Sequence, residues 1–149
     1  SGILSCLTAE QQLQLLFTQD SDGNTALYYA ALQGHTETVK ILLDNLTPDQ
    51  QLQLLLTQNK YGNTAVHFAV QYGYTKTVKT LLDNLAPEQQ LKLLSVQNEE
   101  GKTASQEAKG EKKYIKTILV QYQIEADYAA HYREFTQFAQ SSNHIKYFN

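Results

Sequence analysis

Apolar side chains recur along the chain at three- and four-residue spacing, which is the pattern of one face of an amphipathic helix. One run covers residues 26–31 and stops before Gly34, a residue type that commonly ends a helix. The next run begins at Thr36 and continues to about Asn45. No segment shows the sustained apolar–polar alternation of a half-buried strand, so the pattern predicts an all-α fold.

A third, shorter helix is predicted where the chain becomes rich in leucine and glutamine. Thr47 can cap its first turn while Gln50 reaches back to the cap. Pro48 takes the first helical position, where a missing N–H loses no hydrogen bond. The arrangement occurs without proline from Thr8. Three leucines then share one face and are expected to point inward: Leu52, Leu55 and Leu56.

This succession of helices repeats with a period of 39 residues. The motif Gly-Asn-Thr-Ala at 23–26 recurs at 62–65 and, as Gly-Lys-Thr-Ala, at 101–104. Residues 7–45 and 46–84 align without a gap and are identical at 24 of 39 positions. An Asn or Asp stands three residues before each of the three glycines, which is a turn signal. We infer that these segments are duplicated structural units.

The two intact units share a longer motif around these turns. It reads Gly-x-Thr-Ala-Leu-Tyr-x-Ala-Ala-x-x-Gly-His from Gly23 and Gly-x-Thr-Ala-Val-His-x-Ala from Gly62. This motif resembles the ankyrin repeat, which has a period of about 33 residues and the signature Thr-Pro-Leu-His-x-Ala. Alanine replaces the proline in both units, and only His67 keeps the histidine. The resemblance covers residues from about 20 to 119, and the additional residues of each unit supply the third helix.

The resemblance implies an all-α, ankyrin-type helical solenoid with an extra short helix in each repeat and a C-terminal capping helix. The terminal repeat is degenerate, because Lys109–Lys113 replaces a longer turn. Aromatic residues at helical spacing then predict a helix from about Glu125 to Gln140, which caps this unit through Tyr128, Tyr132, Phe135 and Phe138. The expected divisions are a partial repeat with its added helix at 1–19, repeats at 20–58 and 59–97, the degenerate repeat at 98–121, and the capping helix with its tail at 122–149.

Composition argues against several classes of function. Twelve basic against 15 acidic residues give a net charge of −3, which disfavours general binding to nucleic acids or anionic membranes. No run approaches the roughly 18 apolar residues of a membrane span. Cys6 is the only cysteine, so it forms neither an internal disulfide nor a cysteine-based metal site, and a reducing cytoplasm is the expected compartment. Ser1, in place of methionine, suggests a piece of a longer protein.

The histidines and lysines carry little sign of catalysis. By the resemblance, His67 stabilises a turn through hydrogen bonds between repeats, and His35 is also structural. His131 and His144 have no third ligand near them in sequence, so no metal site is expected. Phosphate-binding loops and nucleophile motifs are absent from the sequence, so we expect no cofactor and no enzymatic activity. The lysine-rich turn at 109–116 is expected to be solvated, with binding of an acidic partner or a phosphate as the alternative.

The differences between the two intact units are concentrated in one stretch. Eleven of the 15 differing positions lie among residues 20–37 and their counterparts. By the resemblance, this stretch forms the hairpin tip and inner helix that line the concave, partner-binding surface, where tyrosines are typical anchors. The alternative for Tyr29 and Phe68 is packing between repeats. The candidate partner-binding residues are Asp22, Asn24, Tyr29, Leu32, Gln33, Lys60, Tyr61, Asn63, Phe68, Gln71, Tyr72 and Tyr74.

These observations favour a non-enzymatic, monomeric module that binds a protein partner, with no metal, membrane or nucleic acid involved. Long ankyrin repeats rich in leucine and glutamine resemble those of intracellular bacteria, whose ankyrin proteins often act as effectors delivered to host proteins. Two alternatives stay open. One is a substrate-presenting region of a larger enzyme, and the other is a self-assembly segment in which the helix at 125–140 pairs with itself.

Overall fold

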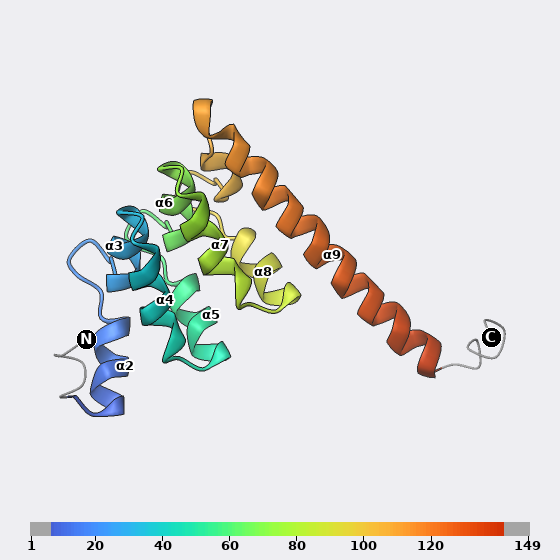
Figure 1. Cartoon of the computed structure of the whole chain (residues 1–149), viewed down its shortest axis with the longest axis horizontal. Coiled ribbons are helices and arrows are strands. Elements are labelled where there is room, and N and C mark those ends of the chain that lie inside the picture. Colours follow the sequence, from blue (N-terminus) through green and yellow to red (C-terminus); the bar gives the residue numbers. More distant parts are fainter. Residues whose placement is uncertain (1–6, 142–149) are drawn as a thin grey trace.

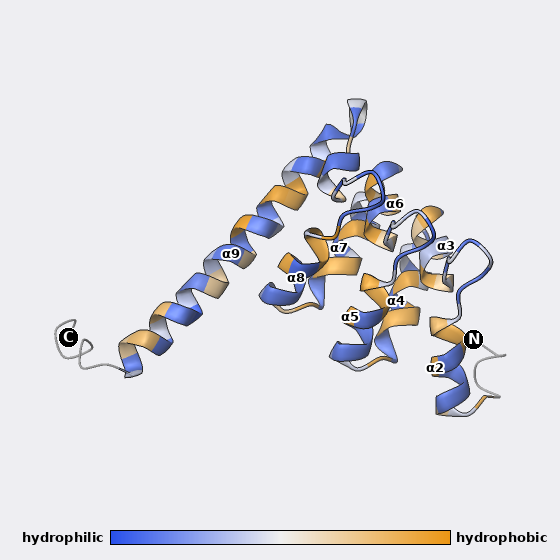
Figure 2. Cartoon of the chain, turned by 180° about the vertical axis from the view of Figure 1, so that it is seen from behind, coloured by the Kyte–Doolittle hydropathy of each residue, from blue (hydrophilic) through white to orange (hydrophobic). Residues whose placement is uncertain are grey.

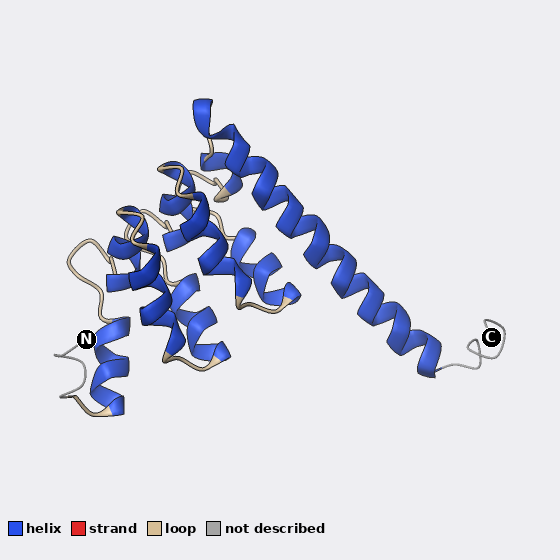
Figure 3. Ribbon diagram, in the orientation of Figure 1, coloured by secondary structure: helices blue, strands red, loops and turns tan. Residues whose placement is uncertain are grey.

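The computed structural model describes residues 7–141, which form eight α-helices and two short 3₁₀ helices and contain no strand (Figure 1 and Figure 3). This confirms the predicted all-α repeat fold, with the third helix present in each of the two complete units. The described chain begins with α2 (Ala9–Phe17). The first complete unit comprises α3 (Ala26–Leu32), α4 (Thr36–Asp44) and α5 (Pro48–Leu56). The second comprises α6 (Ala65–Gln71), α7 (Thr75–Asp83) and α8 (Pro87–Leu94). The third comprises η1 (Ser105–Glu107), η2 (Gly110–Lys112) and α9 (Lys113–Ser141).

Capping interactions at the start of α5 are those that the sequence predicts. The Thr47 hydroxyl accepts a hydrogen bond from the Gln50 N–H at 3.2 Å, and the Gln50 side-chain oxygen accepts one from the Thr47 N–H at 3.0 Å. Pro48 is the first helical residue. Thr8 and Gln11 make the same reciprocal pair at the start of α2. These side chains satisfy two of the backbone N–H groups that a helix start leaves without an internal partner.

The buried face of α5 differs from the predicted one. Leu54 and Leu55 are buried, together with Gln51, whereas the predicted Leu52 and Leu56 are half-buried. The physical reason is that the Gln51 side chain binds the end of α4. Its amide donates to the Leu43 carbonyl at 2.8 Å, which also accepts the Leu46 N–H, and lies 3.4 Å from the Leu46 carbonyl. These bonds hold Gln51 on the buried face of α5.

Side-by-side stacking of equivalent helices forms the core. Inner helix α3 packs on α6, outer helix α4 packs on α7, and α8 packs on both α5 and α9. Of the leucines expected in this core, Leu43, Leu81 and Leu82 are buried but Leu42 is only half-buried. In the described chain, α4 has an outer helix on one side, whereas α7 lies between α4 and α9 (Figure 1). The end position of α4 accounts for the exposure of Leu42.

Asparagine side chains join the hairpin tips of successive units into a ladder. The Asn59 side-chain oxygen accepts bonds from the N–H groups of Tyr61 and Asn63, and its amide donates to the Asn24 side chain at 3.1 Å. Asn98 repeats the arrangement in the next unit, donating to the Asn63 side chain at 2.9 Å. Each asparagine thus folds its own turn and also binds the turn before it.

Backbone contact between the tips is close, and glycine makes it possible. The Lys60 N–H donates to the Asp22 carbonyl at 3.0 Å. A Cβ on Gly62 would lie 2.8 Å from the Glu99 nitrogen, and Gly62 also has a φ of +78°. Gly101 has a similar φ of +74°, yet no atom would lie within 4 Å of its Cβ. Gly62 is therefore required by both conformation and space, and Gly101 by conformation alone.

The C-terminal helix is present, but it begins earlier than predicted and presents a different face to the repeats. α9 starts at Lys113 rather than at about Glu125, because no glycine or proline interrupts the chain between them. Its buried residues, Ile115, Leu119 and Ala126, lie on the side packed against α8 and η1. The expectation that the aromatic residues pack on the third unit is wrong, since each of these is more than half exposed: Tyr128, Tyr132, Phe135 and Phe138.

None of the helices within residues 7–141 is both long and apolar enough to cross a membrane. The expectations about Ser1, Cys6 and His144 concern positions outside the described residues.

We expect Leu81→Ala to lower the free energy of unfolding by about 2–5 kcal/mol, because it would leave a cavity between helices that pack on both sides. Leu42→Ala removes the equivalent side chain from a half-buried position and should cost clearly less. Urea unfolding of the two variants measures the difference. Equal losses would contradict the assignment of α4 to the end of the described stack.

Gly62→Ala and Gly101→Ala separate the conformational from the steric requirement at the tips. Both impose a left-handed conformation on alanine, which costs about 1–2 kcal/mol. Only Gly62→Ala also pushes a methyl group against the next tip, so it should destabilise the chain by clearly more than Gly101→Ala. Chemical denaturation at one pH is sufficient to compare them, and indistinguishable losses would refute the tight contact.

Candidate functional site

The inner helices bring aromatic rings from two units into one continuous row. This aromatic row consists of Tyr29, Tyr28, Phe68, Tyr72 and Tyr74. The Tyr28 ring joins the units, with centroid distances of 5.5 Å to Tyr29 and 4.5 Å to Phe68, both edge-to-face. Phe68 then stacks on Tyr72 at 6.4 Å, and Tyr72 stacks on Tyr74 at 6.2 Å. These are favourable geometries for aromatic pairs, so the rings hold one another in place.

The row has a buried base and an exposed edge. Tyr28 is buried, and burial raises the pKa of its phenol to about 12. Tyr29 and Tyr72 expose 41% and 46% of their surface. The Tyr29 hydroxyl donates to the Asp20 carboxylate, and this bond lowers the pKa of Asp20. The side chains of Tyr29 and Tyr72 are thus exposed to solvent in positions that neighbouring groups already restrain.

Residues of the third unit complete the row at its far end. The Lys112 ammonium lies 5.7 Å from the centre of the Tyr72 ring, within the range of a cation–π contact, and donates to the Gln71 carbonyl at 2.9 Å. The Tyr114 hydroxyl donates to the Gly73 carbonyl at 3.0 Å. The sequence assigned Lys112 to a solvated turn and left Tyr114 out of the candidate site. The only sequence signal for either residue is the unusual density of lysine at 109–116.

Tyr61 belongs to a separate spot at the hairpin tip. Lys60 forms an ion pair with Asp22 at 2.6 Å and lies 5.1 Å from the centre of the Tyr61 ring. Hydrogen bonding to Asp22 raises the pKa of the Lys60 ammonium. Tyr61 precedes α6 and Tyr72 follows it, so the length of the helix, about 10 Å, separates them. Both tyrosines are exposed as expected, but they do not form one cluster.

His67 connects two units within the core. Its Nε2 lies 3.0 Å from the Lys102 carbonyl of the next unit, and its Nδ1 lies 2.9 Å from the Thr64 hydroxyl. Because a carbonyl can only accept, Nε2 carries the proton and Nδ1 accepts from Thr64. Burial lowers the pKa of the imidazole below its ordinary value of 6.5. His67 is therefore a neutral, structural histidine, as the sequence predicted.

The other titratable side chains of the described residues do not gather into a reactive site. Within residues 7–141, no three histidine, cysteine, aspartate or glutamate side chains lie close enough to hold a metal ion. His35 is exposed at the N-cap of α4, where its backbone N–H, rather than its imidazole, bonds to the Ala30 carbonyl. His131 is exposed on α9. The expected structural role of His35 is thus carried by its backbone.

Comparison with protein families gives a match to the model for ankyrin repeats in three copies, over residues 3–92. The chain belongs to the ankyrin repeat family. A chain in the crystal structure of the yeast ribosomal protein Rps3 in complex with its chaperone Yar1 is similar, with a TM-score of 0.66 and 29% identity. The match covers 80% of this chain and 79% of that chain. Comparison with curated protein sequences returned no significant match.

Two of the candidate partner-binding residues belong to the ankyrin scaffold instead. Asn24 is buried, accepts the Asn59 amide and donates to the Tyr29 hydroxyl at 3.3 Å. Asn63 accepts the Asn98 amide in the same way. Their side chains are occupied by the ladder, which explains why they are identical in both repeats. Of the remaining candidates, Asp22, Leu32, Phe68 and Tyr74 are half-buried, and Tyr29, Gln33, Lys60, Tyr61, Gln71 and Tyr72 are exposed.

Part of the divergence between the two ankyrin units lies inside the core. Leu27 and Ala31 are buried, and so are Val66 and Val70 at the equivalent positions. These exchanges alter internal packing and supply no contact surface. Other exchanges lie at the surface, where Asp22 is replaced by Tyr61 and Gln33 by Tyr72 in the second unit. These two exchanges lie at the hairpin tip and at the end of the inner helix, whereas others, such as Glu37 to Lys76, lie on the outer helices.

His67 makes stability depend on pH. Its pKa in the folded chain lies below 6.5, so the unfolded chain binds the proton more readily. The stabilisation is complete above pH 6.5 and is lost as the pH falls below that value. We expect the free energy of unfolding to decrease from pH 7.5 to about 5.5, and His67→Gln to flatten this dependence.

The matched control for this prediction is His35→Gln, which replaces an exposed imidazole. Asp20 and Glu100, whose pKa values are lowered from 3.8 and 4.5, reduce stability only at more acidic pH. Urea unfolding across this pH range is the measurement. A dependence that persists unchanged in His67→Gln would mean that His67 is not the titrating group.

Proposed function

We propose that this chain is a non-enzymatic binding module that holds a partner protein against the exposed edge of the aromatic row and the neighbouring hairpin tip. The observation that carries the proposal is the pattern of surface differences between two nearly identical units. Asn24 and Asn63 of the ladder are the same in both, whereas Asp22, Leu32 and Gln33 become Tyr61, Gln71 and Tyr72. A surface that varies on a largely shared scaffold fits recognition of a partner.

The physical properties of this surface support the proposal. Tyr29, Tyr61 and Tyr72 offer large, amphipathic contact areas, and ring contacts or a nearby lysine already restrain them. A partner therefore loses less conformational entropy in ordering them than it would with flexible side chains. Membership of the ankyrin family supports a protein as the partner. The similar yeast structure is itself a complex between two proteins, a ribosomal protein and its chaperone.

Two details of the proposal, the cellular compartment and delivery to a host cell, rest on the sequence alone. Action in the cytoplasm follows from the use of a single cysteine. Delivery to a host cell, as an effector acting on a host protein, follows from the resemblance of the long repeats to those of intracellular bacteria.

We expect that photo-crosslinking through position 72 captures a protein partner from a cell lysate, since Tyr72 lies at the exposed edge of the row. Once the partner is identified, Tyr61→Ala or Tyr72→Ala should weaken its binding by about 2 kcal/mol or more, roughly thirtyfold. Tyr61→Ala should leave stability within about 0.5 kcal/mol of the unaltered chain. Tyr72→Ala loses two ring contacts and should cost about 1 kcal/mol.

Ile41 provides the matched control, because it is exposed on outer helix α4, away from the inner helices. A crosslinker at position 41 should capture no partner, and Ile41→Ala should leave binding unchanged. Binding that depends on Ile41 and not on either tyrosine would refute the proposed surface.

A further inference from the structure

α9 has a second apolar face that does not contact the repeats. This outer face consists of Val120, Ile124, Tyr128, Tyr132 and Phe135, which are between 41% and 71% exposed. At about 100° per residue, the five lie within a sector of about 120°. The centre of this sector is about 180° from that of the buried residues, Ile115, Leu119 and Ala126. Gln121 and His131 also fall within the sector, so it is apolar but not purely so.

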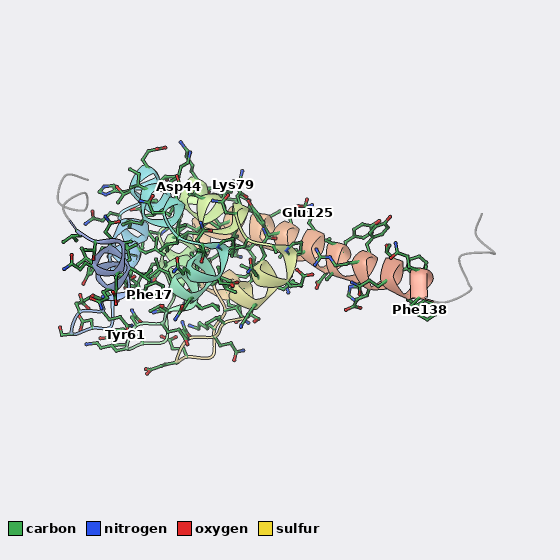
Figure 4. The ribbon with its side chains drawn as sticks, turned by 90° about the horizontal axis from the view of Figure 1, so that it is seen from below. Phe17, Asp44, Tyr61, Lys79, Glu125 and Phe138 are labelled. Atoms are coloured by element: carbon green, nitrogen blue, oxygen red, sulfur yellow. The ribbon has the colours of Figure 1, made fainter. Side chains whose placement is uncertain are left out.

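The outer face is also far from the proposed binding surface. α9 follows α8 as far as Arg133, which pairs with Glu88 at the start of α8. Beyond that point the helix extends past the repeats, and Figure 2 shows apolar patches along its whole length. In Figure 4, Tyr61 lies on the loops of the repeats and Phe138 at the opposite, far end of α9. A partner on the outer face would therefore leave the aromatic row open.

The exposed apolar area is large enough for a specific interface. Aromatic side chains bury about 150–250 Å² each, so half-exposure of five large side chains corresponds to roughly 500 Å² on one chain. Two such faces in contact would bury about 1,000 Å², which is the lower limit for a biological interface. A second copy supplies an equal face without any other molecule.

Charges along one edge of the outer face favour such a pairing. Lys116, Asp127 and Glu134 lie within about 20° of one another around the helix. The positive charge is near the N-terminal end of α9 and the negative charges are nearer its C-terminal end. If two helices meet head to tail about a two-fold axis, this edge of one copy lies beside the same edge of the other. A centre near residue 125 then brings Lys116 alongside Glu134 of the second copy, twice in each dimer.

We propose that the chain forms an antiparallel dimer through the outer faces of two α9 helices. The dimer buries the aromatic side chains that the repeats leave exposed and pairs the two Lys116–Glu134 edges. On the opposite edge, Glu125 of one copy lies beside Glu125 of the other at the two-fold axis, so two attractive pairs stand against one contact between like charges. The inference departs from the monomer expected from the sequence, and it is independent of the proposed partner surface.

The oligomeric state of the whole chain tests the proposal. Light scattering across micromolar to millimolar concentrations should show a monomer–dimer equilibrium. Tyr128→Glu places a charge in the centre of the outer face and should raise the dissociation constant about thirtyfold per copy, or about a thousandfold per dimer. Circular dichroism should show unchanged helix content, because Tyr128 is 71% exposed. Ile41→Glu, which alters an apolar residue on α4 that is also more than half exposed, should leave the dimer intact.

Reversal of the edge charges tests the orientation. Lys116→Glu and Glu134→Lys should each weaken the homodimer about tenfold, because each turns two attractive pairs into repulsive ones. A mixture of the two variants should form a heterodimer as stable as the original, since both pairs become attractive again. A monomer at every concentration would overturn the proposal. So would a dimer that withstands Tyr128→Glu, or the absence of heterodimer from the mixture.

Discussion

The contact between successive hairpin tips is the constraint on which the rest of this molecule depends. The second and third tips are folded by Asn59 and Asn98, each of which also donates to the previous tip, and Gly23 and Gly62 leave the space into which the next backbone fits. Because this contact sets the offset between units, it also sets which rings of the inner helices meet. The 4.5 Å approach of Tyr28 to Phe68, and with it the aromatic row, follows from the register of the tips.

The helices of the two complete units and their ends could be predicted because they depend on neighbours in sequence, whereas the start of α9 was predicted twelve residues too late. The capping box at Thr47 and the turn at Asn59 require only residues two to four positions away. The burial of Gln51 could not be predicted in this way, since its side chain binds a carbonyl eight residues earlier, at the end of another helix. The outer face of α9 escaped prediction for a similar reason. Helical spacing shows that a face is apolar, but it does not show whether another surface covers it.

Comparing the residues of the two units identified the candidate surface only in part. Asn24 and Asn63 each accept a hydrogen bond from an asparagine 35 residues later in the chain. This shared role explains why both units have asparagine at this position, and it removes both side chains from the surface open to a partner. The change of Leu27 to Val66 is a difference within the core, which is invisible without the fold. The exposure of Tyr61 and Tyr72 could be predicted, because an exchange of a polar residue for tyrosine is tolerated where solvent can accommodate both.

The regular spacing of the bonds between successive tips has a consequence for how such a chain can become longer. The same bonds recur from each unit to the next at fixed separations: 35 residues for the asparagine pairs, 38 for the backbone bond, and 39 for the Gln58 amide and the Gln97 carbonyl. An inserted copy of one unit would therefore find the bonding partners at its tips already in place on both sides. The array can grow by duplication within the gene without a new contact between tips, and the 24 identities between residues 7–45 and 46–84 fit such a duplication.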